Sequence, residues 1–574
     1  MDLQTLRHSC AHVMAQAVKE LWPNTKLGIG PAIEDGFYYD FDRPQPFTEQ
    51  DLGLIEERMY QIVARSQPFC RIELSKEEAK KIFLENEETY KLELLNQIPD
   101  EKVSIYKTGD SFLDLCRGPH VENTSQIKAF KLLSVAGAYW HGIETNPMLQ
   151  RIYGTCFEKT EELKEYLKNL EEAKTRDHRR LGPQLGFFDI YYEEAGAGLV
   201  FYHPNGALLR KIIEDYEKEE HLKRGYQLVV TPHIMQAGLW KTSGHYDYYR
   251  ENMYTFKIDD KEFVLKPMNC PGHILIYKSQ TRSYKDLPLR FFELGTVYRY
   301  EKPGVLHGLL RVRGFTQDDA HIFCLSQQLE SEIAAIIDFV FDTMKIFGFK
   351  EVGIELSTQP AKYIGSEEDW QLATEALKNA LNKKGLDYEV NIGEGAFYGP
   401  KIDIKLKDAL RRKWQCATIQ CDFALPSRFG LVYIDAEGKK QQPIMLHRVI
   451  LGSLERFIGA LLENYKGGLP VWLAPVQVII LPIKDALQPY AQQCQEFLRI
   501  EGIRVELDSS NETLQKRIRN AELARIPYIA VVGEKERQDK TLAIRRRGVK
   551  EISTMSLNDL LLKLKNEIDK KTIN

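Results

Sequence analysis

The sequence predicts a multidomain protein that combines α+β and α/β folds, and three observations lead to this prediction. Its 574 residues are enough for about three or four domains. A content of 43% hydrophobic and 28% charged residues is typical of folded globular proteins. The pattern of apolar residues also changes character twice along the chain, near residues 158–185 and near residues 467–470.

The first change is an amphipathic helix rich in Glu and Lys. Apolar residues recur at helical spacing from Leu163 to Leu170 and form one stripe. The sequence Leu-Gly-Pro at 181–183 predicts the end of this helix. We therefore predict a linker helix at 158–185 that follows an N-terminal domain at 1–157.

The middle segment, residues 186–470, predicts an α+β domain with an antiparallel sheet. A helix is expected over 207–224, with Gly225 as its C-terminal stop. Several β-like stretches have long connections between them, which suits antiparallel pairing. These stretches are 228–231, 263–265, 290–294, 402–405 and 430–434.

Residues 471–574 predict a small α/β domain. Strands at 476–481, 504–507 and 528–532 alternate with helical segments, which indicates a largely parallel sheet. This part holds 18 Lys and Arg against 14 Asp and Glu, whereas the whole chain has a formal charge of −4. The positive excess fits either a polyanionic partner or an ordinary solvated surface.

The N-terminal residues and the cysteines indicate a cytoplasmic protein. Polar residues, including His8 and His12, stand where a secretory signal would need an apolar block. No apolar run has the length of a membrane helix. The nine cysteines are irregularly spaced, so metal or catalytic roles take precedence over a disulfide framework.

Segment 299–321, RYEKPGVLHGLLRVRGFTQDDAH, has the densest set of reactive side chains. No glycine-rich phosphate loop occurs, so a nucleotide site would have to be built from side chains. Arginines can clamp phosphates, an aromatic ring can stack on a base, and Asp and His can bind a metal or a hydroxyl. A charged surface hairpin is the alternative. The residues concerned are Arg299, Arg311, Arg313, Phe315, Asp318, Asp319 and His321.

Three segments jointly resemble the signature motifs of class II aminoacyl-tRNA synthetases. They are the helix and strand that end at Pro232, the segment from Phe292 to His321, and LHRVILGSLER at 446–456. MNCPGH at 268–273 and RVRGFTQDDAH are similar to threonyl-tRNA synthetases in particular. The resemblance covers essentially the whole chain. It implies a class II antiparallel-sheet core, a homodimer formed through the first motif, and ATP, L-threonine and tRNA(Thr) as ligands.

The resemblance also implies what each domain does. Residues 1–157 are similar to the editing domain that threonyl- and alanyl-tRNA synthetases share. Residues 186–470 would be the catalytic domain and residues 471–574 the anticodon-binding domain. Bacterial members usually begin with a further small β-rich domain, whereas this sequence begins seven residues before His8. We expect editing to persist without that domain, with some loss of tRNA affinity.

One set of residues matches those that bind ATP and Mg²⁺ in the family. Arg299 would hold the α-phosphate, Glu301 would contact the adenine amino group, and Phe315 would stack on the ring. Arg311 and Arg456 would bind the outer phosphates. Arginine and magnesium at these places would stabilise the charge that develops as a carboxylate attacks the α-phosphorus.

Other residues match the amino-acid and transfer site. His245 would assist transfer to the terminal ribose of tRNA, with Gln420 near that ribose. The resemblance assigns the substrate site to Met268, Gln317, Asp319, Tyr398, Lys401, Gln415 and Thr418.

The resemblance implies one zinc ion per subunit, held by Cys270, His321 and His447. Spacing alone would favour Cys270 with His273. Three protein ligands leave a position open for the amino and hydroxyl groups of threonine, and Asp319 would accept the hydroxyl proton. Valine lacks the hydroxyl and would be rejected. Serine lacks only a methyl, so a second, hydrolytic site is predicted.

The N-terminal domain supplies candidates for that second site. His8 and His12 share a face if their segment is helical, and Cys116 and His120 follow later in the chain. Such a set suits zinc, and a chance core arrangement is the alternative. In threonyl-type relatives it is regarded as a metal-independent site that hydrolyses Ser-tRNA, so we expect histidines that position water, with zinc as the minor interpretation. Tyr39, Lys91 and Asp114 match further residues of that pocket. Lys91 would stabilise the oxyanion that develops during hydrolysis.

In the C-terminal domain, Glu536, Arg545 and Arg547 match the RNA-reading region of the family, and a solvated turn is the alternative.

Two rival functions remain open. One is a synthetase of the same fold with another amino-acid specificity, such as serine or proline. The three zinc ligands argue against it. The other is a noncatalytic RNA-binding relative, against which the retained arginines argue.

Overall fold

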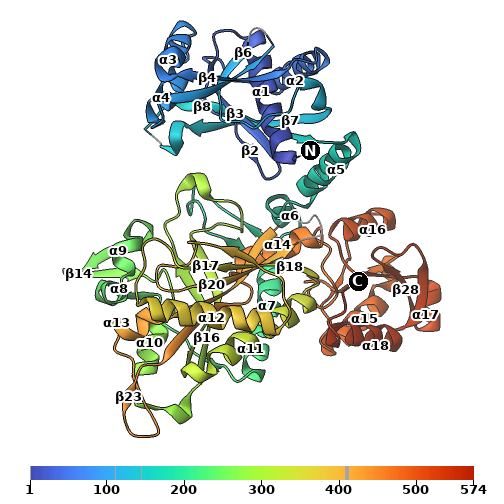
Figure 1. Ribbon diagram of the computed structural model, residues 1–574. Helices are drawn as coiled ribbons and strands as arrows, with labels where there is room; N and C mark the ends of the chain where they lie inside the picture. Colours follow the sequence, from blue (N-terminus) through green and yellow to red (C-terminus); the bar gives the residue numbers. More distant parts are fainter. Residues whose placement is uncertain (1, 110–111, 144, 408–412, 574) are drawn as a thin grey trace. The chain divides into compact units, whose positions relative to one another are not determined.

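A computed structural model gives the structure of the protein over residues 2–109, 112–143, 145–407 and 413–573. The chain divides into two compact units, Met1–Glu172 and Ala173–Asn574 (Figure 1). Antiparallel sheets, a mixed sheet and helices occur together, which confirms the predicted fold class. None of the helices in the described part of the chain is long and apolar enough to cross a membrane.

The described part of the first unit combines helices with two sheets. Its elements are α1 Leu3–Leu21, β1 Lys26–Leu27, β2 Ala32–Ile33, β3 Gly36–Asp42, α2 Glu49–Ala64, β4 Phe69–Ser75, α3 Lys76–Glu85, α4 Thr89–Gln97, β5 Lys102–Thr108, β6 Phe112–Leu115, β7 Ala129–Tyr139 and β8 Met148–Phe157. One sheet has the order β1-β3-β8-β7, with β2 beside β3, and the other has the order β4-β5-β6. Asp2 caps the start of helix α1, and its carboxylate accepts two backbone N–H groups of the first turn. Its small and apolar side chains bury it against α2, β3 and β8.

The linker differs from its prediction. Helix α5, Thr160–Arg176, stops before the Leu-Gly-Pro sequence, and a separate short helix α6, His178–Gln184, contains Pro183. Asp177 causes the break, because its backbone is not helical and its carboxylate caps α6 by accepting the N–H of Arg179. The chain therefore has two helices where one was expected, and the boundary between the units falls within α5.

The second unit is built around an eight-stranded sheet with the order β11-β16-β17-β24-β21-β20-β18-β19. Its neighbouring strands are antiparallel except at the two ends, where β11 and β19 pair in parallel. The strands of this sheet are β11 Gln227–Leu228, β16 Leu289–Tyr298, β17 Gly314–Cys324, β18 Glu351–Ser357, β19 Glu389–Asn391, β20 Lys401–Lys407, β21 Lys413–Asp422 and β24 Ile444–Val449. Apolar side chains of the sheet and of four helices form one core, and these helices are α7 Pro204–Lys223, α11 Leu329–Ile346, α12 Glu367–Lys383 and α14 Leu454–Asn464.

Helix α7 confirms the prediction at its C-terminal end, where Gly225 has a φ of 76° that favours glycine. The strand predicted at 228–231 is shorter, since only its first residue lies in β11. Smaller elements surround the sheet: β9 Phe188–Asp189, β10 Phe201–Tyr202, β12 Ile234–Gln236, α8 Ala237–Ser243, α9 His245–Tyr249, β13 Thr255–Ile258, β14 Lys261–Leu265, α10 Cys270–Lys278, β15 Arg282–Ser283, α13 Ala424–Arg428, β22 Tyr433–Ile434 and β23 Lys440–Gln441.

The C-terminal part of this unit has a five-stranded sheet of order β26-β25-β27-β28-β29. Its elements are β25 Val478–Pro482, α15 Gln488–Ile500, β26 Val505–Leu507, α16 Leu514–Leu523, β27 Tyr528–Val532, α17 Glu534–Asp539, β28 Thr541–Arg546, β29 Ile552–Ser556 and α18 Leu557–Asp569. The three predicted strands pair in parallel. Strands β28 and β29 add an antiparallel edge, so the sheet is mixed rather than largely parallel.

Candidate functional site

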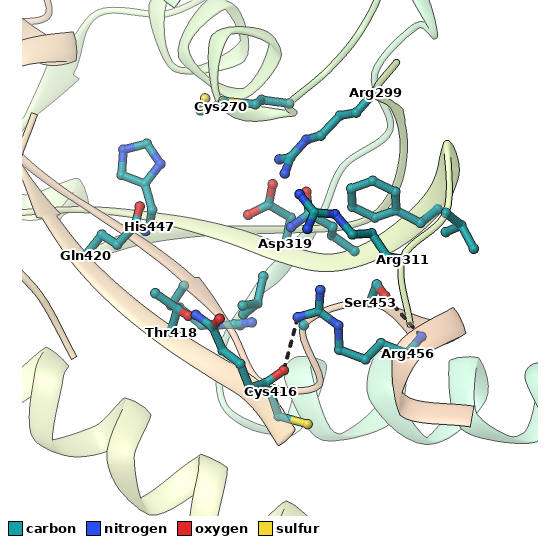
Figure 2. A pocket seen from close by; sticks show the side chains of 18 of the residues that line it. Cys270, Arg299, Arg311, Asp319, Cys416, Thr418, Gln420, His447, Ser453 and Arg456 are labelled. Carbon is teal, nitrogen blue, oxygen red and sulfur yellow. Dashed lines mark hydrogen bonds between the residues drawn. The ribbon is translucent and has the colours of Figure 1, made fainter. Parts of the chain in front are cut away.

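A cavity of about 420 Å³ opens beside the eight-stranded sheet, and segments that are distant in the sequence line it (Figure 2). All but two of the residues that the family resemblance assigned to ATP, amino acid, metal and transfer are found there. The predicted residues that line the cavity are Met268, Cys270, Arg299, Glu301, Arg311, Phe315, Gln317, Asp319, His321, Tyr398, Gln415, Thr418, Gln420, His447 and Arg456.

Strand β17 contributes four of these side chains because alternate residues of a strand share one face. Phe315, Gln317, Asp319 and His321 line the cavity at intervals of two residues. Asp318 lies between them in sequence and does not line it. Its carboxylate accepts hydrogen bonds from three consecutive backbone N–H groups ahead of α14. The interpretation of Asp318 as a metal or hydroxyl ligand is therefore wrong, and its role is to hold that turn.

Three arginines bring positive charge to one side of the cavity. Figure 2 shows the side chains of Arg299, Arg311 and Arg456 extending toward a common space. Backbone carbonyls accept hydrogen bonds from Arg299 and Arg456 and so fix both side chains. Arg311 forms an ion pair of 3.0 Å with Glu301. Arg313 differs from the sequence expectation, because it donates to the carbonyl of Glu301 and does not line the cavity.

Cys270, His321 and His447 form a possible metal site at the cavity. One ligand atom from each lies within 4.8 Å of the others. The two histidines face each other in the register of β17 and β24, and Cys270 begins α10. The Nε2 atom of His321 lies 3.0 Å from Nδ1 of His447. Sulfur and imidazole nitrogen are ligands that zinc prefers.

Two carboxylates behind the histidines indicate where the ring protons lie. Asp422 is 2.8 Å from Nε2 of His447, and Glu293 is 3.1 Å from Nε2 of His273. If each carboxylate accepts an N–H, Nδ1 of His273 is left to accept the Nδ1–H of His321 across 2.8 Å. The facing nitrogens of His321 and His447 then both carry lone pairs, and a cation between them would bind both. The residues therefore fit a metal ion, and His273 supports one of the ligands by accepting a hydrogen bond from His321.

The other two predicted residues lie outside the cavity lining. His245 begins α9 and is buried, with Nδ1 2.8 Å from the hydroxyl of Ser243. Burial lowers the pKa of His245 to about 4, so the ring is neutral at neutral pH. Lys401 forms an ion pair of 2.7 Å with Asp403, which also accepts hydrogen bonds from two lining side chains of β21. Lys401 is therefore linked to these two lining side chains through Asp403.

The first unit holds a second cluster, formed by His8, His12, Cys116 and His120. One ligand atom of each lies within 4.8 Å of the others, so this cluster also could hold a metal ion. The thiol sulfur lies 3.3 Å from Nε2 of His8 and 3.2 Å from Nε2 of His120. Burial lowers the pKa of all three histidines, which favours neutral rings. The expectation that His8 and His12 share a helix is confirmed by α1.

The three other residues predicted for this pocket are buried beside the cluster. Lys91 pairs with Asp114 at 2.5 Å and lies 2.9 Å from the hydroxyl of Tyr39. That hydroxyl donates to Asp114, which is also 3.6 Å from His12. A cleft of about 560 Å³ reaches Cys116 and is lined by basic, acidic, uncharged polar and apolar side chains.

The predicted RNA-reading residues have different surroundings. Glu536 accepts the backbone N–H of Gly533 at the start of α17, and Arg545 lies on β28. Arg547 donates to the carbonyls of Gly468 and Leu469 in the segment before β25. This placement gives Arg547 a structural role at the junction, so Glu536 and Arg545 are left as the candidates for RNA contact.

Several residues of both sites escaped the sequence reasoning. Asp422 and Glu293 orient the histidines of the cavity, and Asp403 organises one wall. Ser9 holds His120 in the first unit, since its hydroxyl donates to a carbonyl and must accept from Nδ1 of that ring. Each of these residues acts by holding another side chain in place. A single polar residue in a strand or helix does not show in the sequence which side chain it will contact.

The sequence matches three known families. Residues 254–465 match the tRNA synthetase class II core domain (G, H, P, S and T), and residues 477–567 match an anticodon binding domain. Residues 103–153 match the threonyl and alanyl tRNA synthetase second additional domain.

Individual proteins show the same likeness. The threonine–tRNA ligase of Oleidesulfovibrio alaskensis is 57% identical over 97% of this chain and 86% of its own length. That of Pelobacter propionicus is 57% identical over 97% of this chain and 87% of its own length. Among solved structures, the RNA binding domain of threonyl-tRNA synthetase from Cryptosporidium parvum gives a TM-score of 0.66 at 44% identity, covering 68% of this chain and 98% of that one.

Proposed function

The chain belongs to the threonine–tRNA ligase family, and we propose that it joins L-threonine to tRNA(Thr) in two steps. In the first, a carboxylate oxygen of threonine attacks the α-phosphorus of ATP, the bond to pyrophosphate breaks, and threonyl-adenylate forms. In the second, a hydroxyl of the terminal ribose attacks the carbonyl carbon and AMP leaves. The observation that carries the proposal is one cavity that joins three arginines to the set Cys270, His321 and His447. Threonine-dependent exchange of pyrophosphate into ATP tests it.

The arginine side of the cavity suits ATP with Mg²⁺. Arg299 would bind the α-phosphate, and Arg311 and Arg456 the outer phosphates, while Phe315 would stack on adenine and Glu301 would contact its amino group. The guanidinium of Arg299 already lies 5.1 Å from the centre of the Phe315 ring. Fixed positive charge near the α-phosphorus stabilises the charge of the transition state more than that of the ground state.

The opposite side suits threonine. One zinc ion per subunit would be held by Cys270, His321 and His447. As a Lewis acid it would bind the amino and hydroxyl groups of threonine. Asp319 would accept the proton of the threonine hydroxyl. Burial raises the pKa of Asp319, so its carboxylate is a stronger base than an exposed one. Asn269 holds this carboxylate by donating to it at 3.0 Å. The side chains that would surround the amino acid are Met268, Gln317, Tyr398, Gln415 and Thr418.

Transfer to tRNA would use the left side of the cavity in Figure 2. Gln420 lines that side and accepts a hydrogen bond from the hydroxyl of Tyr398. His245 is buried near this wall, with its ring centre 6.1 Å from that of Phe397. A neutral imidazole can accept the proton that the ribose hydroxyl loses. We assign His245 this role once the ribose is bound.

The cluster in the first unit would hydrolyse tRNA(Thr) that carries serine. Neutral His8, His12 and His120 can orient a water molecule and accept its proton. Lys91 is buried and paired with Asp114, and it would stabilise the oxyanion that forms when water attacks the ester. The match to the second additional domain supports this role. The chemistry proposed here needs no metal ion, although the four ligand atoms could hold one.

Replacing His12 or Cys116 by alanine should separate the two activities. We expect hydrolysis of Ser-tRNA(Thr) to fall by about 100-fold or more, because general base catalysis and water positioning are lost. Threonine activation should remain unchanged. Rates of deacylation of prepared Ser-tRNA(Thr) measure the effect, with His141→Ala, an exposed histidine of the same unit, as the control. Undiminished hydrolysis in both variants contradicts the assignment.

The C-terminal domain would read the anticodon of tRNA(Thr), as its family match indicates. Glu536 and Arg545 are the candidates, since arginine can stack on a base or read its edge and a carboxylate can accept base amino groups. Weakened charging with normal pyrophosphate exchange in Arg545→Ala would support this.

A role in protein synthesis also favours the cytoplasm as the location, which cell fractionation tests.

The edge of the large sheet supports a homodimer. Strand β11 ends the sheet order, and three large apolar side chains near it are exposed: Leu228, Val230 and Ile234. Val230 is 88% exposed. A second copy that covers this edge would bury them.

A charge at this edge should separate the subunits. Val230→Asp would place an unpaired carboxylate in the interface, so we expect monomers in sedimentation experiments where the unmodified protein is a dimer. Ile392→Asp is the matched control, since Ile392 is 86% exposed and follows β19 at the other end of the sheet. Equal dimerisation of both variants contradicts an interface at β11.

A further inference from the structure

His178 links the connecting segment to the loop that carries Arg311. It is the first residue of α6, and its side chain is completely buried. The backbone N–H of Leu309 donates to its Nε2 at 2.9 Å. Its Nδ1 lies 2.6 Å from a carboxylate oxygen of Glu463, near the end of α14.

These partners determine where the proton of the ring lies. Because the N–H of Leu309 can only donate, Nε2 of His178 must present a lone pair. The proton is therefore on Nδ1 and is donated to Glu463, which also accepts the backbone N–H of His178. Asp177, His178 and Glu463 have the composition of a metal site. Both ring nitrogens are already used, so the arrangement is a hydrogen-bonded relay instead.

The loop on this relay forms part of the ATP side of the cavity. Leu310 and Arg311 line the cavity directly after Leu309. The carbonyl of Leu310 accepts a hydrogen bond from Arg456 at 3.3 Å. The N–H of Leu309 and the carbonyl of Leu310 are thus both held, the first by His178 and the second by Arg456, a proposed phosphate ligand.

Gly308 is needed for this approach of loop and ring. It has a φ of 47°, and a Cβ atom there would lie only 2.2 Å from Nε2 of His178. A side chain at this position would push the loop away from the histidine. The chain therefore has a glycine where the hydrogen bond to Leu309 requires close contact.

We propose that His178 is a positioning residue for ATP. By accepting from Leu309 while it donates to Glu463, it holds the loop of residues 303–313 so that Arg311 faces the outer phosphates. The hydrogen bond to Leu309 affects ATP binding because it fixes the position of the loop that carries Arg311. The contact to Glu463 orients the ring. The inference rests on the proposed activation of threonine by ATP.

Two substitutions separate the two halves of the relay. In His178→Asn the amide nitrogen can replace Nδ1 as the donor to Glu463, and the acceptor for Leu309 is lost. In His178→Gln the amide oxygen can replace Nε2, and the acceptor for Leu309 is kept. We expect the KM for ATP in pyrophosphate exchange to rise about tenfold in His178→Asn and by less than about threefold in His178→Gln. The KM for threonine should not change in either.

Controls distinguish positioning from loss of folding. Thermal unfolding shows whether each variant is folded, and Gly308→Ala leaves the histidine in place while it displaces the loop. We expect the same ATP-specific rise in KM for Gly308→Ala. An unchanged KM for ATP in folded His178→Asn or in Gly308→Ala overturns the inference, as do equal changes for ATP and threonine. Absence of threonine-dependent exchange in the unmodified protein would instead refute the proposed function.

Discussion

Replacing Arg299 by alanine should lower threonine-dependent pyrophosphate exchange by about 100- to 1,000-fold at saturating substrates, which is the loss typical when one preorganised donor to a developing charge is removed. The structure prepares this side chain for such a role. A carbonyl accepts its Nε–H at 3.2 Å, and the remaining part of the guanidinium extends toward the cavity (Figure 2). Alanine cannot stabilise the charge that develops at the α-phosphorus. The rate at saturation should therefore fall and not only the affinity for ATP.

A surface arginine gives the control for this experiment. Arg499 pairs with Glu496 on the exposed face of α15, so Arg499→Ala should leave exchange unchanged. Circular dichroism establishes that both variants are folded. A fall of less than about threefold in Arg299→Ala would place the α-phosphate elsewhere in the cavity and would remove the main argument for this orientation of ATP.

Cys270→Ala should abolish selective activation of threonine. Without the sulfur ligand the remaining set of His321 and His447 is incomplete, so we expect loss of bound zinc and of threonine-dependent exchange. Discrimination against valine rests on the hydroxyl, and polar sites of this kind reject an analogue that lacks the group by about 10⁴ to 10⁵. Any residual exchange in the variant should therefore show no preference for threonine over valine. Metal analysis and exchange assays measure the two effects.

The matched control is Cys70→Ala, since Cys70 is an exposed cysteine of the first unit. It should keep both the metal content and the preference for threonine. Asp422→Asn should give an intermediate result, because it weakens the hydrogen bond that orients His447 and lowers metal affinity by about 10- to 100-fold. Full activity of Cys270→Ala free of metal contradicts the proposed selection of threonine.

Local patterns in the sequence predict part of this site and not the rest. The spacing of two from Phe315 to His321 predicts one face of a strand, and β17 has that face. The same rule would have excluded Asp318, which the charge pattern alone favoured. Cys270 and His447 meet His321 only through the placement of α10 and the register of β17 with β24. No local pattern encodes that register, so the family resemblance was needed to predict it.

The fold shows the same limit. Apolar periodicity predicted α7 and the three parallel strands of the C-terminal sheet, because those patterns follow from burial. It failed at the linker, where the cap at Asp177 starts a new helix and Pro183 is accommodated near the end of α6. Periodicity also carries no information on Arg547, which the resemblance assigned to RNA contact, because its hydrogen bonds to the carbonyls of Gly468 and Leu469 depend on how the C-terminal domain packs onto the preceding segment.

The most direct test is pyrophosphate exchange into ATP with each of the twenty amino acids, before and after removal of zinc. We predict exchange with threonine, weaker exchange with serine, none with valine, and loss of exchange with threonine when zinc is removed and its return when zinc is restored. Exchange with a different amino acid would keep the fold and contradict the specificity. Absence of exchange with every amino acid, in folded protein, would contradict the proposed enzyme activity itself.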